Sequence, residues 1–151
     1  MSIWTHVSGM IRIDDWTFDE SNRRSYDEIT KMFKMSIKEN NWAKGCNMPC
    51  GSEGSIHYVV IPNSDKSCVN NCQISFWGDL RDYDSKDIDR EFHQWLNKIV
   101  KKLEKKNYLV RQLVFLVESE DNNRQVMFIG KWDHDGSLEE DSKFTIERIT
   151  L

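Results

Sequence analysis

IHYVVIPNSDKSCVNNCQISFW, residues 56–77, is the stretch that decides the fold. Ile56 to Ile61 is a largely apolar run of strand length, and Cys72 to Trp77 is a second run rich in β-forming residues. The intervening Pro-Asn-Ser-Asp, residues 62–65, is typical of a turn because it contains residues that break regular structure. We therefore predict two strands that pair as a hairpin.

Upstream of this hairpin the sequence predicts a strand and then a helix. Ile3 to Ile13 alternates between apolar and polar residues, which is the period of a half-buried strand. Ser25 and Glu28 have the spacing of a capping box, which marks the start of a helix. Apolar residues then recur at helical spacing to about Asn40: Tyr26, Ile29, Phe33 and Ile37.

Downstream of the hairpin a second helix is predicted, capped by Asp84 or Ser85. Three further strands follow, from Leu109 to Val117, from Val126 to Trp132 and from Phe144 to Leu151. An Asn122-Asn123 turn joins the first two, and a polar acidic loop, residues 133–142, joins the last two. The second helix should bury a stripe made of Ile88, Phe92, Trp95 or Leu96, Ile99 and Leu103.

The predicted order is β-α-β-β-α-β followed by one or two strands, within a single α+β domain that covers residues 1–151. The first six elements match a ferredoxin-like fold, in which two helices cover one face of an antiparallel sheet. In that topology three loops should meet at one end of the sheet: residues 40–55, 78–85 and 118–124. Binding residues concentrate on loops held by a rigid scaffold, so we expect function at this end.

Composition narrows the classes of protein to consider. The chain has 151 residues, of which 38% are hydrophobic, including six Trp and seven Phe, and its net charge is -4. An acidic balance argues against a nucleic-acid binder, which needs clustered Lys and Arg. The first 15 residues lack the long apolar core of a signal peptide, and no apolar run has the length of a membrane span. We therefore expect a protein of the cytoplasm with no membrane partner.

The spacing of the four cysteines suggests a zinc site, because Cys46, Cys50, Cys68 and Cys72 form two C-x3-C pairs. The predicted hairpin argues against it, since Cys50 lies at its open end and Cys68 near its turn. Six extended residues separate those ends by on the order of 20 Å. Zinc would need the sulfurs about 4 Å apart. The sequence therefore predicts two local pairs or four separate thiols, with no metal and no cofactor.

Gly51-Ser52-Glu53-Gly54-Ser55 precedes a predicted strand. Its backbone N–H groups could form an anion-binding nest, as glycine-rich turns do. It lacks the Gly-Lys-Ser/Thr ending of a P-loop, and it precedes a strand rather than a helix. The alternative is a tight turn in which glycine permits positive backbone angles, and we favour that alternative.

Gly78-Asp79-Leu80-Arg81-Asp82-Tyr83 joins a strand to the second helix. Asp79 and Asp82 could hold a metal ion or transfer protons. Arg81 and Tyr83 could instead be exposed anchors, because both residue types are enriched at binding hot spots. A third interpretation is an ion pair that orders the loop. We rank catalysis last, and leave anchoring and ordering equal.

Histidines and tryptophans complete the candidates. The histidines at positions 6, 57, 93 and 134 have no Cys or Ser partner at motif spacing, so no catalytic residue is predicted. A tryptophan exposed beside the loops would form a recognition surface, because Trp gives a large contact area at low entropic cost. The candidates are Trp16, Trp42, Trp77 and Trp132.

The segments CNMPCGSEGS (residues 46–55), GDLRDY (78–83) and WTHVSG (4–9) resemble a family of small, largely uncharacterised phage and prophage proteins. The resemblance covers segments of about the first 85 residues and brings no established activity. Cys68 and Cys72 fall outside it. It implies an origin in a mobile element, and small phage proteins without enzyme motifs often bind a host factor.

Three functions follow as hypotheses. The first is a non-enzymatic, phage-encoded protein that binds a host protein, and one such role is inhibition of a host defence system. The second is a binder of a small anionic ligand such as a nucleotide, through the N–H groups of Gly51 to Ser55 and through Arg81. The third is a divalent-metal-dependent hydrolase that uses Glu53, Asp79 and Asp82. The predicted binding residues are Gly51, Ser52, Glu53, Gly54, Asp79, Arg81, Asp82 and Tyr83.

Overall fold

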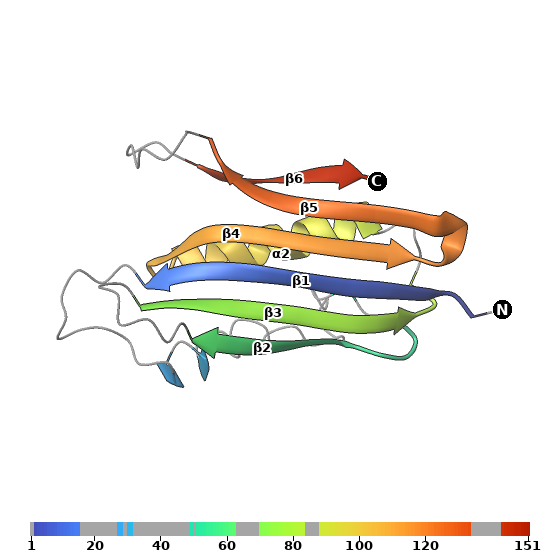
Figure 1. The fold of residues 1–151 in the computed structure, drawn as a ribbon, viewed down its shortest axis with the longest axis horizontal. Coiled ribbons are helices and arrows are strands. Elements are labelled where there is room, and N and C mark those ends of the chain that lie inside the picture. The colour runs from blue at the N-terminus through green and yellow to red at the C-terminus, as the bar shows by residue number, and fades with distance from the viewer. Residues whose placement is uncertain are drawn as a thin grey trace.

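Long antiparallel strands dominate the computed structural model, which describes residues 2–15, 27, 28, 30, 31, 49, 51–62, 70–83, 88–133 and 143–151. A long helix, α2 (Ile88–Glu104), and a short 3-10 turn, η3 (Asp121–Asn123), accompany them. The strands form one six-stranded sheet in the order β2-β3-β1-β4-β5-β6 (Figure 1). They are β1 (Trp4–Asp15), β2 (Ile56–Pro62), β3 (Asn70–Arg81), β4 (Tyr108–Ser119), β5 (Arg124–Trp132) and β6 (Phe144–Thr150).

The N-terminal strand β1 lies at the centre of the sheet, between β3 and β4, and is antiparallel to both. Trp4 is opposite Arg81 of β3, and Thr5 is opposite Ser119 of β4. The register with β4 shifts between Arg12 and Ile13, as at a β-bulge. This pairing brings the start of β1 beside the ends of β3 and β4.

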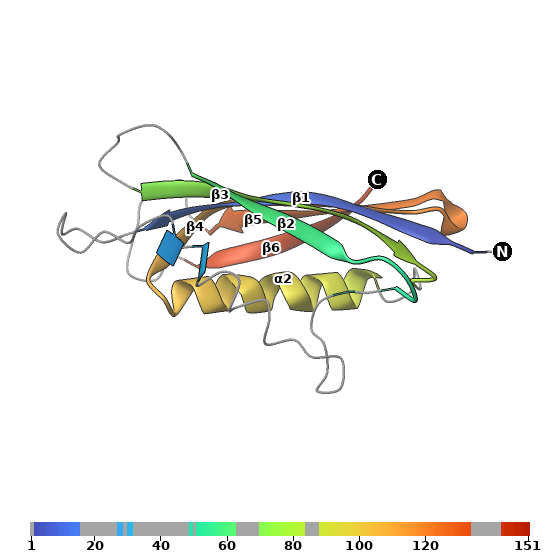
Figure 2. The ribbon, with the colours of Figure 1, turned by 90° about the horizontal axis from the view of Figure 1, so that it is seen from below.

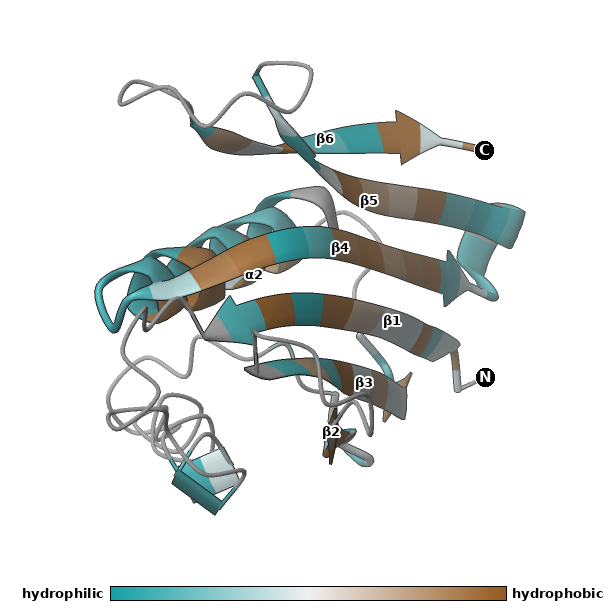
Figure 3. Cartoon of the chain, turned by 60° about the vertical axis from the view of Figure 1, so that its left-hand side comes forward, coloured by the Kyte–Doolittle hydropathy of each residue, from teal (hydrophilic) through white to brown (hydrophobic). Residues whose placement is uncertain are grey.

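The helix α2 covers one face of the sheet (Figure 2) and packs on β4 and β6. Figure 3 shows long hydrophobic stretches in β4, and burial alternates along this strand, so the core lies on one face of the sheet. An aromatic cluster joins helix and sheet: Trp95 contacts Phe76, Phe92 and Phe115 edge-to-face. Since each of these side chains is at most 2% exposed, the cluster is the centre of the core.

The predicted ferredoxin-like βαββαβ fold with two helices on one face is wrong. The described residues form mostly a six-stranded antiparallel sheet, with one long helix against it. Both C-terminal strands were predicted, but β1 and β3 have 12 residues each and only one long helix is described, so strand outweighs helix in the described part of the chain. The predicted helix to about Asn40 lies outside the described residues except for Asp27, Glu28, Thr30 and Lys31, which are helical.

Other local predictions are confirmed. The predicted hairpin is β2 paired antiparallel with β3, and the last two predicted strands are β5 and β6, which also pair. No helix among the described residues is long and apolar enough to cross a membrane.

Candidate functional site

Three segments that are distant in sequence meet where β1 begins and β3 and β4 end. The Asp82 N–H donates to the Ile3 carbonyl at 2.7 Å, and the Glu120 N–H donates to the Trp4 carbonyl at 3.0 Å. The Arg81 N–H donates to the Glu53 carbonyl at 2.9 Å. The predicted meeting of three loops is therefore confirmed for their described residues. We call the polar side chains gathered there the rim cluster: Ser2, His6, Ser52, Glu53, Asp79, Arg81, Asp82 and Glu120.

The glycine-bearing segment lies directly against the end of β3. The Ser52 N–H donates to the Arg81 carbonyl at 2.7 Å. A Cβ placed on Gly51 would lie 2.1 Å from that same carbonyl oxygen. One on Gly54, whose φ is +82°, would lie 1.9 Å from the Asp79 carbonyl oxygen. These glycines therefore allow two backbones to approach closely, as the tight-turn interpretation requires.

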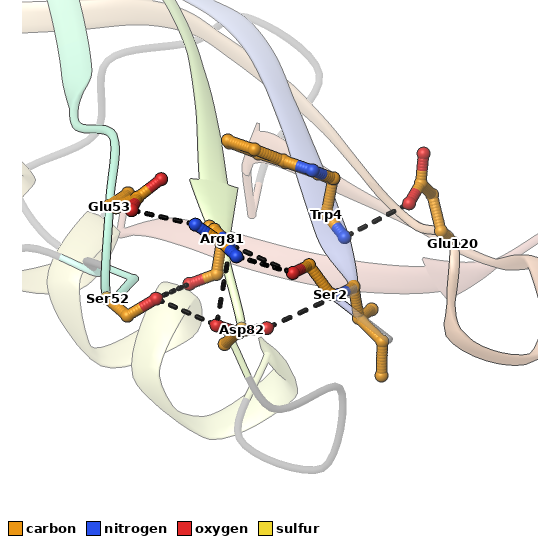
Figure 4. Close-up of polar contacts among 8 residues, drawn as sticks. Ser2, Trp4, Ser52, Glu53, Arg81, Asp82 and Glu120 are labelled. Carbon is orange, nitrogen blue, oxygen red and sulfur yellow. Dashed lines mark hydrogen bonds and ion pairs between the residues drawn. The ribbon is translucent and has the colours of Figure 1, made fainter.

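Arg81 contacts three other residues of the rim cluster through its side chain (Figure 4). Its Nη1 lies 2.7 Å from Glu53 Oε1, and its Nε lies 3.7 Å from Asp82 Oδ2. Its Nε and Nη2 both donate to Ser2 Oγ, at 3.0 and 2.7 Å. Since these contacts engage Nε, Nη1 and Nη2, the guanidinium orders the loops around it.

Asp82 holds the start of β1 against the glycine-bearing segment. Ser52 Oγ donates to Asp82 Oδ2 at 2.9 Å (Figure 4), and the Ile3 N–H donates to Oδ1 at 3.3 Å. The Ser52 hydroxyl, then the Ile3 N–H and the charge of Arg81, lower the pKa of Asp82. The backbone of Asp82 has a φ of +54°, which an Asp tolerates better than most residues.

His6 and Glu120 belong to this cluster although the sequence did not predict them as site residues. The imidazole Nδ1 lies 2.6 Å from Asp79 Oδ1, and Nε2 lies 3.7 Å from Glu120 Oε1. The hydrogen bond with Asp79 is the main cause of a raised pKa for His6. His6 alternates with buried Thr5 and Val7 on β1, which indicated the exposed face but not the partners.

Tyr83 does not have the position predicted for an exposed anchor. It is 6% exposed, and its hydroxyl donates to Glu91 Oε2 at 2.8 Å. Its ring packs edge-to-face on Phe92. Tyr83 therefore fixes the start of α2 to the sheet, and the exposed-anchor interpretation of this residue is wrong.

The three carboxylates of the predicted hydrolase do not converge on one point. Glu53 and Asp82 both face Arg81, while Asp79 faces His6. The described part of the chain holds no group of three or more His, Cys, Asp or Glu that could hold a metal ion. Of the four cysteines only Cys72 is described, and it is buried; the other three lie outside the described residues.

A second candidate surface lies beside the rim cluster, on the face of the sheet opposite α2. Trp77 is 49% exposed, and its ring stacks on His57 with centroids 6.0 Å apart. Val59 and Ile61, on the same face of β2, are 42% and 45% exposed. We call these four residues the Trp77 patch.

Trp77 thus has the exposure predicted for a recognition residue. Trp132 differs, because it is half-buried against Phe144 and its indole N–H donates to the Val110 carbonyl at 3.1 Å. Trp16 and Trp42 lie outside the described residues. The rest of the patch could not be predicted from the sequence. Both faces of β2 carry apolar residues, so no alternation of apolar and polar residues indicated which side is exposed.

Comparisons with known proteins do not place the chain in a family. No known protein family matches the sequence, and no curated protein does. Among solved structures, the aminopeptidase PepT of Bacillus cereus is 11% identical, with a TM-score of 0.42, over 79% of this chain and 29% of that one.

Two other solved structures resemble the chain over most of both lengths. The Csm3-Csm4 subcomplex of a type III-A CRISPR-Cas interference complex is 10% identical over 99% of this chain and 92% of that one, with a TM-score of 0.41. A phage SAM lyase in its apo state is 8% identical over 96% and 89%, with a TM-score of 0.37. Likenesses this weak carry no argument about function. The resemblance to phage proteins therefore stays a prediction.

Proposed function

We propose that this chain is a non-enzymatic binding protein, encoded by a phage or prophage, that engages a host protein through the Trp77 patch. A component of host defence is the class of partner that the sequence resemblance favours. The half-exposed indole of Trp77 is the observation that carries the proposal. Trp is one of three residue types enriched at hot spots, which cluster near the centres of protein interfaces.

Burial of the exposed part of Trp77 against a partner would be favourable. A tryptophan side chain buries about 200 Å² when it is covered, and roughly half of Trp77 is open. Covering the open half would contribute about 2.5 kcal/mol at about 25 cal/mol per Å². Val59 and Ile61 extend the apolar area next to it, which supports the proposal because the buried core of an interface is apolar.

The border of the patch predicts the charge of the partner. Asp79 follows Trp77 on the same face of β3, and Glu53 and Glu120 lie beyond it in the rim cluster, each more than half exposed. Acidic side chains on one side of an apolar centre complement a partner with Lys or Arg at the matching edge. We expect the host protein to present an apolar pocket with such a basic border.

Replacement of Trp77 tests this proposal. The host partner is captured with the wild-type protein, and its affinity for purified variants is then measured by calorimetry. We expect Trp77→Ala to weaken the complex by about 30-fold or more, as loss of a hot spot does.

The control is Leu151→Ala, because Leu151 is 61% exposed and follows the opposite edge strand. It should leave the affinity unchanged. Binding of Trp77→Ala at wild-type strength, with an intact fold by circular dichroism, would remove the Trp77 patch from the interface.

The rim cluster does not support the nucleotide-binding hypothesis or the hydrolase hypothesis in the form predicted from the sequence. The Ser52 N–H and the Arg81 guanidinium, two of the donors expected for a nucleotide, already bond within the protein. The carboxylates expected for a hydrolase are paired with Arg81 and His6.

A further inference from the structure

A hollow of about 350 Å³ opens on the face of the sheet opposite α2, towards the other end of β1 from the rim cluster. None of the predicted site residues lines it. Four neighbouring strands contribute to it, so its base is rigid. Among the described residues its lining is Met10, Arg12, Ile61, Asn71, Cys72, Gln73 and Gln112.

One cross-strand row of side chains organises this hollow. Arg12 of β1 is opposite Gln73 of β3 on one side and Gln112 of β4 on the other. Ile61 of β2 is opposite Gln73 and continues the row. Directly opposite residues share a face of the sheet, so a guanidinium stands between two amides with an isoleucine at one end. Met10, two residues before Arg12, lies on that face too.

Arg12 differs from two other arginines of the sheet. Arg81 contacts Glu53 and Asp82, and Arg111 contacts Asp14. Arg12 is exposed, and the structure shows no ion pair or side-chain hydrogen bond for it in the part of the chain described. The nearest acid along β1, Asp14, is held by Arg111, so it does not neutralise Arg12.

We infer that this hollow binds a small organic anion with a phosphate or carboxylate head. The guanidinium of Arg12 has the fork geometry that pairs with two oxygens of such a head. The amides of Gln112 and Asn71 offer further N–H donors, and Gln73, whose Nε2 donates to Ser75 Oγ at 3.0 Å, has a second N–H on the same nitrogen. Met10 and Ile61 give the body of the ligand an apolar surface, and the volume lies within the usual range of small-molecule sites.

This inference does not rest on the proposed protein complex, because the hollow and the Trp77 patch share only Ile61. A nuclear magnetic resonance titration of the ¹⁵N-labelled protein tests it with three probes: inorganic phosphate, citrate and AMP. We expect saturable shifts at the backbone amides of Arg12, Gln73 and Gln112 and at the Gln side-chain amides. AMP should bind more tightly than phosphate, because its base and ribose can cover Met10 and Ile61.

Arg12→Gln removes the charge while it keeps a polar side chain, and should weaken binding about tenfold or more. Arg148→Gln is the matched control, because Arg148 is an exposed arginine of the distant strand β6 and should leave binding unchanged. Trp77→Ala should also leave it unchanged, which separates this site from the protein interface.

Binding of inorganic phosphate would indicate a site for a phosphate head, and binding of citrate would indicate a site for a carboxylate head. Either result supports the inference. The absence of saturable shifts with all three probes would overturn it. Equal affinity in wild type and Arg12→Gln would also overturn it.

Discussion

At the scale of single residues, the glycines of the rim cluster determine whether two chain segments can touch. Gly54 combines a φ of +82° with an approach to the Asp79 carbonyl that leaves no space for a side chain. The same contact places Glu53 where it reaches Arg81. The need for glycine at position 54 therefore supports the ion pair between Glu53 and Arg81.

We predict that Gly54→Ala destabilises the protein by at least about 1–2 kcal/mol, because alanine resists positive φ and its methyl group meets backbone. Urea denaturation measures the free energy of unfolding. Ser55→Ala is the matched control, since Ser55 is exposed and next in sequence, and it should stay within about 0.5 kcal/mol of wild type. A Gly54→Ala protein as stable as this control would contradict the prediction.

His6 gives the rim cluster a dependence on pH. Asp79 of β3 and Glu120 lie against its ring nitrogens, and Glu118 of β4 is its register partner on the same face. The pKa of folded His6 is raised above 6.5, chiefly by Asp79. The contribution of His6 to stability is therefore full below pH 6.5 and is lost as the pH rises through the folded pKa.

We predict that His6→Gln removes this part of the pH dependence, from pH 6.5 up through the raised pKa of folded His6. The effect should be less than about 1 kcal/mol, because the side chain is 47% exposed and solvent screens the pair. Denaturation of both proteins across this range measures it, and the native His6 resonance gives the pKa directly. A native pKa at or below 6.5 would refute the prediction.

At the scale of elements, α2 is attached to the sheet by aromatic rings. Phe92 is fully buried and contacts Tyr83, Trp95 and Phe128. Tyr83 lies just after β3 and Phe128 in β5, so one side chain connects the helix to distant parts of the sheet.

We predict that Phe92→Ala costs about 3–5 kcal/mol of unfolding free energy, because it leaves a cavity that this rigid sheet cannot close. Gln94→Ala on the exposed side of α2 should change stability by no more than about 0.5 kcal/mol. Thermal and urea unfolding compare the two variants. A loss of under about 1 kcal/mol for Phe92→Ala would show that the helix is held elsewhere.

The elements were predictable where a single period governed the sequence. Apolar and polar residues alternate from Ile3 to Ile13, and this segment forms the predicted strand. Apolar residues recur at helical spacing from Ile88 to Leu103, and this segment forms the predicted helix. Fold class was not predictable in this way, because it depends on how many strands join the sheet and how many helices cover it. Local propensity says little about such long-range choices.

At the scale of the whole molecule, topology predicted where the loops meet but not what their side chains do there. The meeting of Glu53, Arg81 and the segment after β4 followed from strand directions. Burial of Tyr83 and engagement of Arg81 did not, since both depend on neighbours from other strands. The surroundings of Arg12, which has no ion pair with the described residues, could not be predicted either, because they come from four strands.

The central place of the N-terminal strand has a consequence for how the protein is made. β1 leaves the ribosome before the other five described strands, yet its two partners end at Arg81 and Ser119, so its hydrogen bonds must wait until these have been synthesised. Contacts between residues so far apart in sequence slow folding and leave the apolar face of β1 unprotected in the interval. The nascent polypeptide is therefore most prone to aggregate before β4 has been synthesised.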